Sequence, residues 1–276
     1  MKNLHPFLAA GLAIGLLPAI TSADERRFTY VYEPEVLPKG AMEFEQWITL
    51  RTQRTGGGGV QQGNFNRWEL REELEYGVTD RYSVSLYLNA KATSFKDYAS
   101  SPSARASEFK FAGVSLENRY MLVNPVNHLV GITLYFEPTF SGDEAELEQK
   151  IIIGQRHGDW KWALNLGHAV EWEHDLHDVE GELEASFGIA RDFARHWSVG
   201  LELRSHNVLA DHRRWENSAL FVGPSVNYRS EKWWATLSVM PQVYGRNFDG
   251  DPDNNRRLEL TDHERLNVRL IFGISF

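Results

Sequence analysis

The chain has 276 residues, 38 acidic against 29 basic side chains, a formal net charge of −9 and no cysteine. The lack of cysteine excludes disulfides and thiolate metal sites or nucleophiles, and the acidic balance argues against a nucleic-acid partner. Beyond its start the chain has no run of 18 apolar residues, which excludes a transmembrane helix as well.

The chain opens with a positively charged start, an apolar stretch over 7–20 and small residues at 21–23. This order predicts a secretory signal peptide over 1–23, cleaved after Ala23. The apolar stretch is shorter than the about 20 residues that a bilayer-spanning helix needs, which argues against an N-terminal membrane anchor.

Alternation of apolar and polar side chains dominates the rest of the sequence. In 42–52, for example, Phe44, Ile48 and Leu50 share one face while Glu43 and Glu45 share the other. Such a period of two is typical of β-strands. It predicts twelve strands, each near the length that a tilted strand needs to cross a bilayer: 42–52, 65–78, 82–95, 108–122, 128–140, 147–156, 160–174, 181–192, 197–207, 216–228, 233–245 and 266–276.

The connectors between these strands alternate between short and long, and aromatic residues gather at the strand ends. Outer-membrane barrels have short periplasmic turns, longer outer loops and two aromatic girdles. We therefore predict an all-β fold: one closed antiparallel transmembrane β-barrel of twelve strands. The barrel spans residues 41–276, both termini lie in the periplasm, and residues 24–40 form a periplasmic N-terminal segment.

The charged side chains fall mainly on the strand faces that point away from the predicted lipid. Sixteen of them are predicted to line the lumen: Glu43, Glu45, Arg67, Glu69, Arg71, Glu73, Lys91, Glu137, Lys161, Glu171, Glu173, Glu182, Glu184, Glu202, Arg204 and Arg269. An acid-leaning lumen is typical of a channel that passes or binds small solutes and prefers cations. The alternative is a closed structural barrel in which opposite charges cross-link the strands, with binding left to the outer loops.

Two polar residues, Glu72 and Asn118, fall on the predicted lipid face. A carboxylate in lipid is destabilising, so we expect a bulge or a shift of frame within the second strand that turns Glu72 away from lipid.

Two loops resemble metal sites. The run 171–178 carries imidazoles and carboxylates, and 249–254 alternates aspartates like a calcium loop. The first has no established ligand spacing, and the second lacks the glycine and glutamate of a calcium loop. We interpret both as solvated loops and predict no metal centre and no cofactor.

A third, less favoured function is a lipid acyl hydrolase. Ser205 and His206 are adjacent, but neighbours in a strand point to opposite faces, so they cannot pair as nucleophile and base. We predict that the protein is not an enzyme.

The last strand alternates without interruption and stops on the aromatic Phe276. This ending resembles the C-terminal assembly signal of Gram-negative outer-membrane β-barrels. The resemblance implies a location in the cell outer membrane, contact with lipid and lipopolysaccharide, and recognition of Phe276 by the barrel-assembly machinery. The stretch 32–40 before the first strand is similar to barrels grouped with phenol meta-cleavage pathway outer-membrane proteins, which implies solute uptake.

Overall fold

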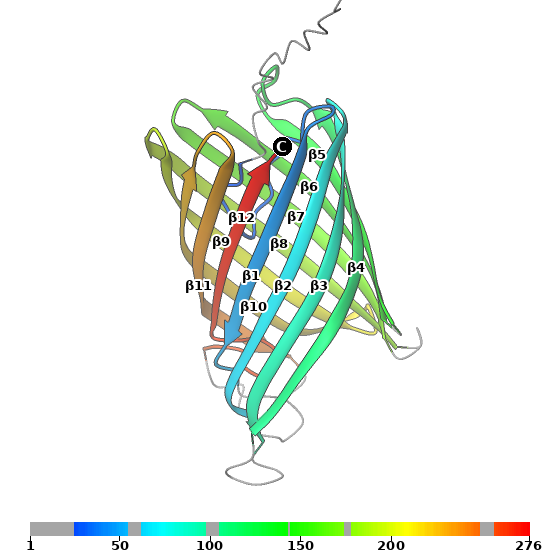
Figure 1. The fold of residues 1–276 in the computed structure, drawn as a ribbon. Helices are drawn as coiled ribbons and strands as arrows, with labels where there is room; N and C mark the ends of the chain where they lie inside the picture. Colours follow the sequence, from blue (N-terminus) through cyan, green and yellow to red (C-terminus); the bar gives the residue numbers. More distant parts are fainter. Residues whose placement is uncertain (1–24, 55–61, 98–104, 143, 174–177, 249–256) are drawn as a thin grey trace, which may run out of the picture.

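A computed structural model describes residues 25–54, 62–97, 105–142, 144–173, 178–248 and 257–276. Within these ranges twelve antiparallel strands close into a single barrel (Figure 1), which confirms the predicted fold. The strands are β1 Met42–Thr52, β2 Gln62–Thr79, β3 Tyr82–Asp97, β4 Arg105–Val123, β5 Gly131–Ser141, β6 Glu144–His157, β7 Trp160–Glu173, β8 Asp178–Ala194, β9 Trp197–Ala210, β10 Arg214–Arg229, β11 Trp233–Asn247 and β12 Leu266–Ser275.

Each strand pairs with its neighbours in sequence, and β12 closes the ring on β1. The closing register runs from Glu43 opposite Ser275 to Thr52 opposite Leu266 without a shift. The C-terminus therefore lies beside the start of β1 (Figure 1). We name this end, where β2 turns into β3, the turn end, and the opposite end the loop end.

Side chains on the two faces of the wall differ sharply. On β3, Leu86 and Leu88 are exposed on the outer face, whereas Ser85 and Tyr87, which alternate with them, are buried inside. The other strands repeat this alternation, so the barrel presents an apolar band outward. An apolar band of this extent around a closed barrel is typical of contact with lipid. The described part of the chain contains no helix long and apolar enough to cross a membrane.

The expectation of a bulge beside Glu72 is wrong. The register of β2 with β1 and with β3 is continuous around this residue, which lies opposite Gln46 and Leu88. Arg71 and Glu73 point inward, since Arg71 bonds the lumenal Glu137 and Glu73 is buried. Glu72 therefore stays on the outer face. Asn118 stays there too, where it accepts a hydrogen bond of 2.8 Å from the Tyr82 hydroxyl.

We expect replacement of Glu72 by leucine to stabilise the barrel by about 1 kcal/mol, because a carboxylate on the lipid face is unfavourable. Urea unfolding in lipid vesicles measures this difference. The matched control is Glu231→Leu in the exposed connection between β10 and β11, which should change the unfolding free energy far less. A Glu72→Leu barrel that is no more stable than the parent would place Glu72 outside the lipid-covered band.

Candidate functional site

All sixteen residues predicted for the lumen lie on inward positions of their strands. Seven of them are buried: Glu43, Glu45, Glu73, Glu137, Lys161, Glu202 and Arg204. The other nine are half-buried: Arg67, Glu69, Arg71, Lys91, Glu171, Glu173, Glu182, Glu184 and Arg269. The structure thus brings the predicted charges into one interior, and the contacts below show how that interior is filled.

The N-terminal segment occupies part of this interior. Residues 25–37 run inside the barrel without forming a strand, with Phe28 and Val31 fully buried. Tyr32 joins an apolar cluster with six wall residues, among them Trp47 of β1 and Trp234 of β11. The sequence predicts a segment outside the barrel, in the periplasm. The structure instead places it within the lumen, because its aromatic side chains find apolar partners there.

Backbone groups of this segment are bonded by wall side chains. The Glu202 carboxylate accepts the N–H of Thr29 at 3.0 Å and the N–H of Tyr30 at 2.7 Å. Asn165 accepts the N–H of Tyr32 at 2.6 Å and donates to its carbonyl at 2.9 Å. A segment with no ladder of its own must satisfy its buried backbone groups in this way.

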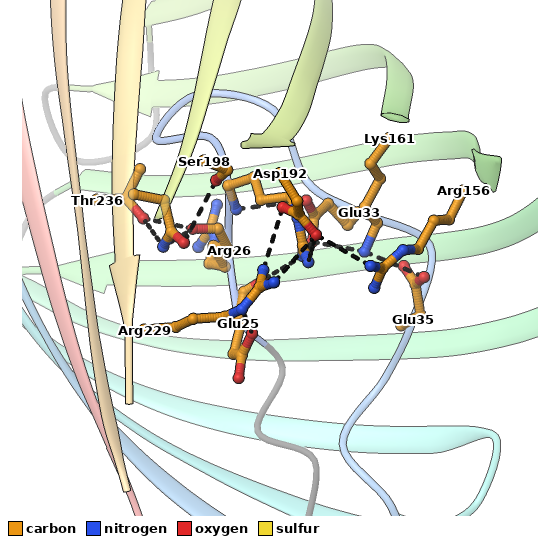
Figure 2. Close-up of polar contacts among 12 residues, drawn as sticks. Glu25, Arg26, Glu33, Glu35, Arg156, Lys161, Asp192, Ser198, Arg229 and Thr236 are labelled. Atoms are coloured by element: carbon orange, nitrogen blue, oxygen red, sulfur yellow. Dashed lines mark hydrogen bonds and ion pairs between the residues drawn. The ribbon is translucent and has the colours of Figure 1, made fainter. Parts of the chain in front are cut away.

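Ion pairs fix the segment near the turn end (Figure 2). Asp192 of β8 accepts from Arg27 of the segment at 3.2 Å and from the wall residues Arg156 and Arg229 at 3.0 and 3.1 Å. Lys161 of β7 contacts Glu33 at 2.9 Å and Glu35 of the segment at 3.1 Å. Opposite charges on wall and segment thus match at this end.

The lumen towards the loop end holds a cavity of about 240 Å³. Its lining comes from β2 to β7 and includes four carboxylates near the start of β6 and the end of β7: Glu144, Glu146, Glu148 and Glu171. Two nearby lysines are already paired, Lys110 with Glu144 at 2.5 Å and Lys150 with Glu148 at 2.8 Å. Negative charge therefore exceeds positive charge around the cavity.

Three carboxylates of β7 and β8 come close together beside this cavity. Oxygen atoms of Glu171, Glu180 and Glu182 lie within 4.8 Å of one another. The histidines of the run 171–178 fall at 174 and 177, outside the described residues, as does the whole of 249–254. The described carboxylates form a compact acidic group on the lumen wall.

A second segment, 257–265 between β11 and β12, is also buried against the lumen. Glu259 accepts the N–H groups of Thr261, Asp262 and His263 at 2.9, 3.1 and 2.9 Å. His263 contacts the Asn217 amide oxygen at 2.7 Å. Burial, followed by the guanidinium groups of three nearby arginines, lowers the pKa of His263 to about 3, so its ring is neutral.

We expect the contacts of 257–265 to weaken as the pH falls. His263 keeps a pKa of about 3 when packed and returns to about 6.5 when the segment opens, so the opened state gains the proton between these values. Between pH 7 and pH 5 this favours opening by about 2 kcal/mol. Amide hydrogen exchange of 257–265 measures the change.

Glu259 acts in the opposite direction, because burial raises the pKa of its carboxyl group in the packed segment. The variant His263→Asn removes the histidine's contribution to the pH dependence. Amide hydrogen exchange of 257–265 in this variant should therefore depend less on pH than in the parent. Equal pH dependence in the two proteins would show that His263 does not control the segment.

Sequence reasoning missed several interior groups. Glu117 and Arg119 of β4 are buried and paired at 3.4 Å, although their alternation with Leu116 and Tyr120 could have identified them. Glu180 falls just outside the predicted eighth strand, 181–192, whereas β8 begins at Asp178. The residues of 25–37 and 257–265 carry no periodic signal.

Ser205 and His206 lie on opposite faces of β9, as the strand period predicts. The His206 ring is buried in the lumen, where its Nε2 lies 3.4 Å from Glu182, whereas the Ser205 hydroxyl accepts a bond from Asn207 two residues along the strand. The two side chains cannot act together as base and nucleophile.

Residues 20–276 match a protein family described as "Family of unknown function (DUF6662)". No curated protein sequence matches the chain. Among solved structures, the barrel is similar to the COG4313 outer membrane channel from Pseudomonas putida F1, with a TM-score of 0.59 and 12% identity, over 88% of this chain and 97% of that one.

Two further structures share the fold. The translocator domain of the autotransporter NalP from Neisseria meningitidis has a TM-score of 0.54 and 9% identity, over 86% of this chain and 88% of that one. The NanC porin has a TM-score of 0.52 and 8% identity, over 84% of this chain and 98% of that one. At these identities the likeness establishes an outer-membrane barrel fold.

Proposed function

We propose that this chain, which belongs to the DUF6662 family, is an outer-membrane channel for small solutes with a charged, acid-leaning lumen. The observation that carries the proposal is the cavity of about 240 Å³ inside the closed wall, lined mainly by charged and polar side chains. Structural barrels gain little from an unfilled polar interior, whereas a channel needs one. The fold shared with porins and channels supports this function.

In this proposal the turn end faces the periplasm and the loop end faces the outside. The apolar band contacts lipid and lipopolysaccharide, and the barrel-assembly machinery recognises Phe276. A solute enters at the loop end, where Glu146 and Glu171 line the cavity, and meets the N-terminal segment before the turn end. Residues 25–37 therefore limit passage.

Conductance in planar bilayers tests the proposal. The purified protein should give current steps above background, and Glu171→Gln combined with Glu173→Gln should change their size or ion preference. An absence of current in the parent and in a variant that lacks 25–36 would remove the channel function.

A closed barrel that binds partners through its outer loops is the second candidate. Two observations favour it: 25–37 fills the lumen near the turn end, and 257–265 is buried against the lumen towards the loop end. Liposome swelling separates the candidates, because a structural barrel should admit no sugar or amino acid even when residues 25–36 are deleted.

A further inference from the structure

Arg26 stands apart from the other charged groups inside the barrel. Its side chain is 4% exposed, yet its Nε and Nη2 atoms have no hydrogen-bond partner among the described residues. The nearest carboxylate oxygen, on Glu45, is 3.7 Å from Nη1. By contrast, Arg71 and Arg204 reach carboxylates at 2.6 and 2.7 Å. A buried guanidinium with unmet donors is costly, so hydrogen bonding does not explain its position.

Aromatic ring faces surround the Arg26 guanidinium instead. Its central carbon lies 4.1 Å from the centre of the Tyr32 ring and 4.4 Å from the Trp47 ring. Both distances are within the range of a cation–π contact, which is strongest when the cation is shielded from water. The rings are fixed by their surroundings, since Trp47 donates to Glu45 at 2.7 Å and packs against other lumenal aromatics.

Two carboxylates complete the surroundings. Glu45 and Glu73 stand opposite each other on β1 and β2 and are 2% and 3% exposed, and the Oε2 atom of Glu45 lies 3.7 Å from Nη1 of Arg26. The Oε2 atom of Glu73 has no hydrogen-bond partner among the described residues. A buried carboxylate oxygen without a donor is a place where a further N–H group could bind.

We call Tyr32, Trp47, Glu45 and Glu73 the cage. The wall provides three of these residues, and the N-terminal segment provides Tyr32 and the cation, Arg26. Trp47, Glu45 and Glu73 belong to β1 and β2, whereas Arg26 is carried by the segment and is held there by its backbone carbonyl, which accepts from Asn227 at 3.0 Å. Ring faces with carboxylates suit an organic cation, whereas Ca²⁺ or Mg²⁺ requires a shell of oxygen ligands.

We propose that Tyr32, Trp47, Glu45 and Glu73 form a binding site for organic cations of the guanidinium or amine type, and that Arg26 occupies it as an internal ligand. A cationic solute competes with Arg26 for this cage. The site deepens the proposed channel function by naming the class of solute, and its role in transport rests on that function. Binding at the cage does not depend on conduction.

The test is a titration of the purified barrel in detergent with methylguanidinium chloride, followed by isothermal calorimetry and by thermal unfolding. Arg26→Ala empties the cage and should bind methylguanidinium at least about tenfold more tightly than the wild type, because the competing side chain is gone. Sodium chloride at equal concentration should not reproduce the effect.

The matched control is Arg27→Ala, which removes a neighbouring guanidinium that bonds to Asp192. This variant should bind methylguanidinium no better than the wild type. Adding Trp47→Leu to Arg26→Ala should abolish the gain in affinity, because the leucine keeps an apolar side chain but has no ring face. If Arg26→Ala fails to fold, Arg26→Gln serves in its place.

Equal affinity in Arg26→Ala, Arg27→Ala and the wild type would overturn the proposal, as would a gain that survives Trp47→Leu. The outcomes are separable from those of the channel experiment. Saturable binding without current would keep the cation site and remove the channel, whereas current without saturable binding would do the reverse.

Discussion

Deletion of residues 25–36 is expected to raise the single-channel conductance by about an order of magnitude, because a twelve-stranded barrel without its filling has a wider lumen. The deleted stretch includes Phe28 and Val31, which are fully buried within the lumen. The turn that follows is kept, since Ala41 bonds the carbonyl of Pro38 at 3.0 Å and leads the chain into β1.

The deletion is measured in planar bilayers beside the exposed turn variant Lys39→Ala, which should conduct like the parent. A second variant loosens the segment instead of removing it. Glu202→Ala combined with Asn165→Ala removes four of the bonds that hold the segment and should increase current fluctuations without deleting any residue. A deleted barrel with unchanged conductance would show that the segment does not limit passage.

Replacing Glu146, Glu171 and Glu180 together by glutamine is expected to lower the preference for potassium over chloride several-fold. These carboxylates have no ion-pair partner among the described residues, so no neighbouring base offsets the negative charge that each carries when it is ionised. In a narrow lumen of low effective dielectric constant such charges attract cations and repel anions.

The reversal potential under a potassium chloride gradient measures this preference. Asp159→Asn in the exposed connection between β6 and β7 is the control and should leave the reversal potential unchanged. An unchanged potential in the triple variant would mean that ions do not pass these carboxylates.

The strands and the inward positions could be predicted because they depend on a local rule. The outer face contacts lipid and the inner face contacts the lumen, so apolar and polar side chains alternate along each strand. This period of two shows which residues point outward and which point inward. Phe44 and Glu45 on β1 follow the rule, as do Leu86 and Ser85 on β3. Strand ends were less well predicted, because β2 to β4 continue beyond the apolar pattern.

The filling of the lumen could not be predicted in this way. Contacts of the N-terminal segment join residues far apart in sequence, such as Tyr32 with Asn165 and Thr29 with Glu202. No local pattern encodes such pairs. One signal was available: 28–32 is rich in aromatic and β-branched residues, which is unusual for a segment left in water. Glu72 is an exception to the local rule. It is a charged residue on the outer face, and the strand register around it is continuous, without the bulge that the rule predicts.

A locking disulfide tests most directly whether the N-terminal segment lies in the lumen and limits passage. The hydroxyl oxygens of Thr29 and Ser238 are 2.9 Å apart, so Thr29→Cys with Ser238→Cys should form a cross-link in this cysteine-free chain. The oxidised barrel should conduct less than the parent, and reduction should restore the parental current. No cross-link in the folded barrel, or a cross-link equally efficient between Thr29→Cys and Ser83→Cys on β3, would contradict the account.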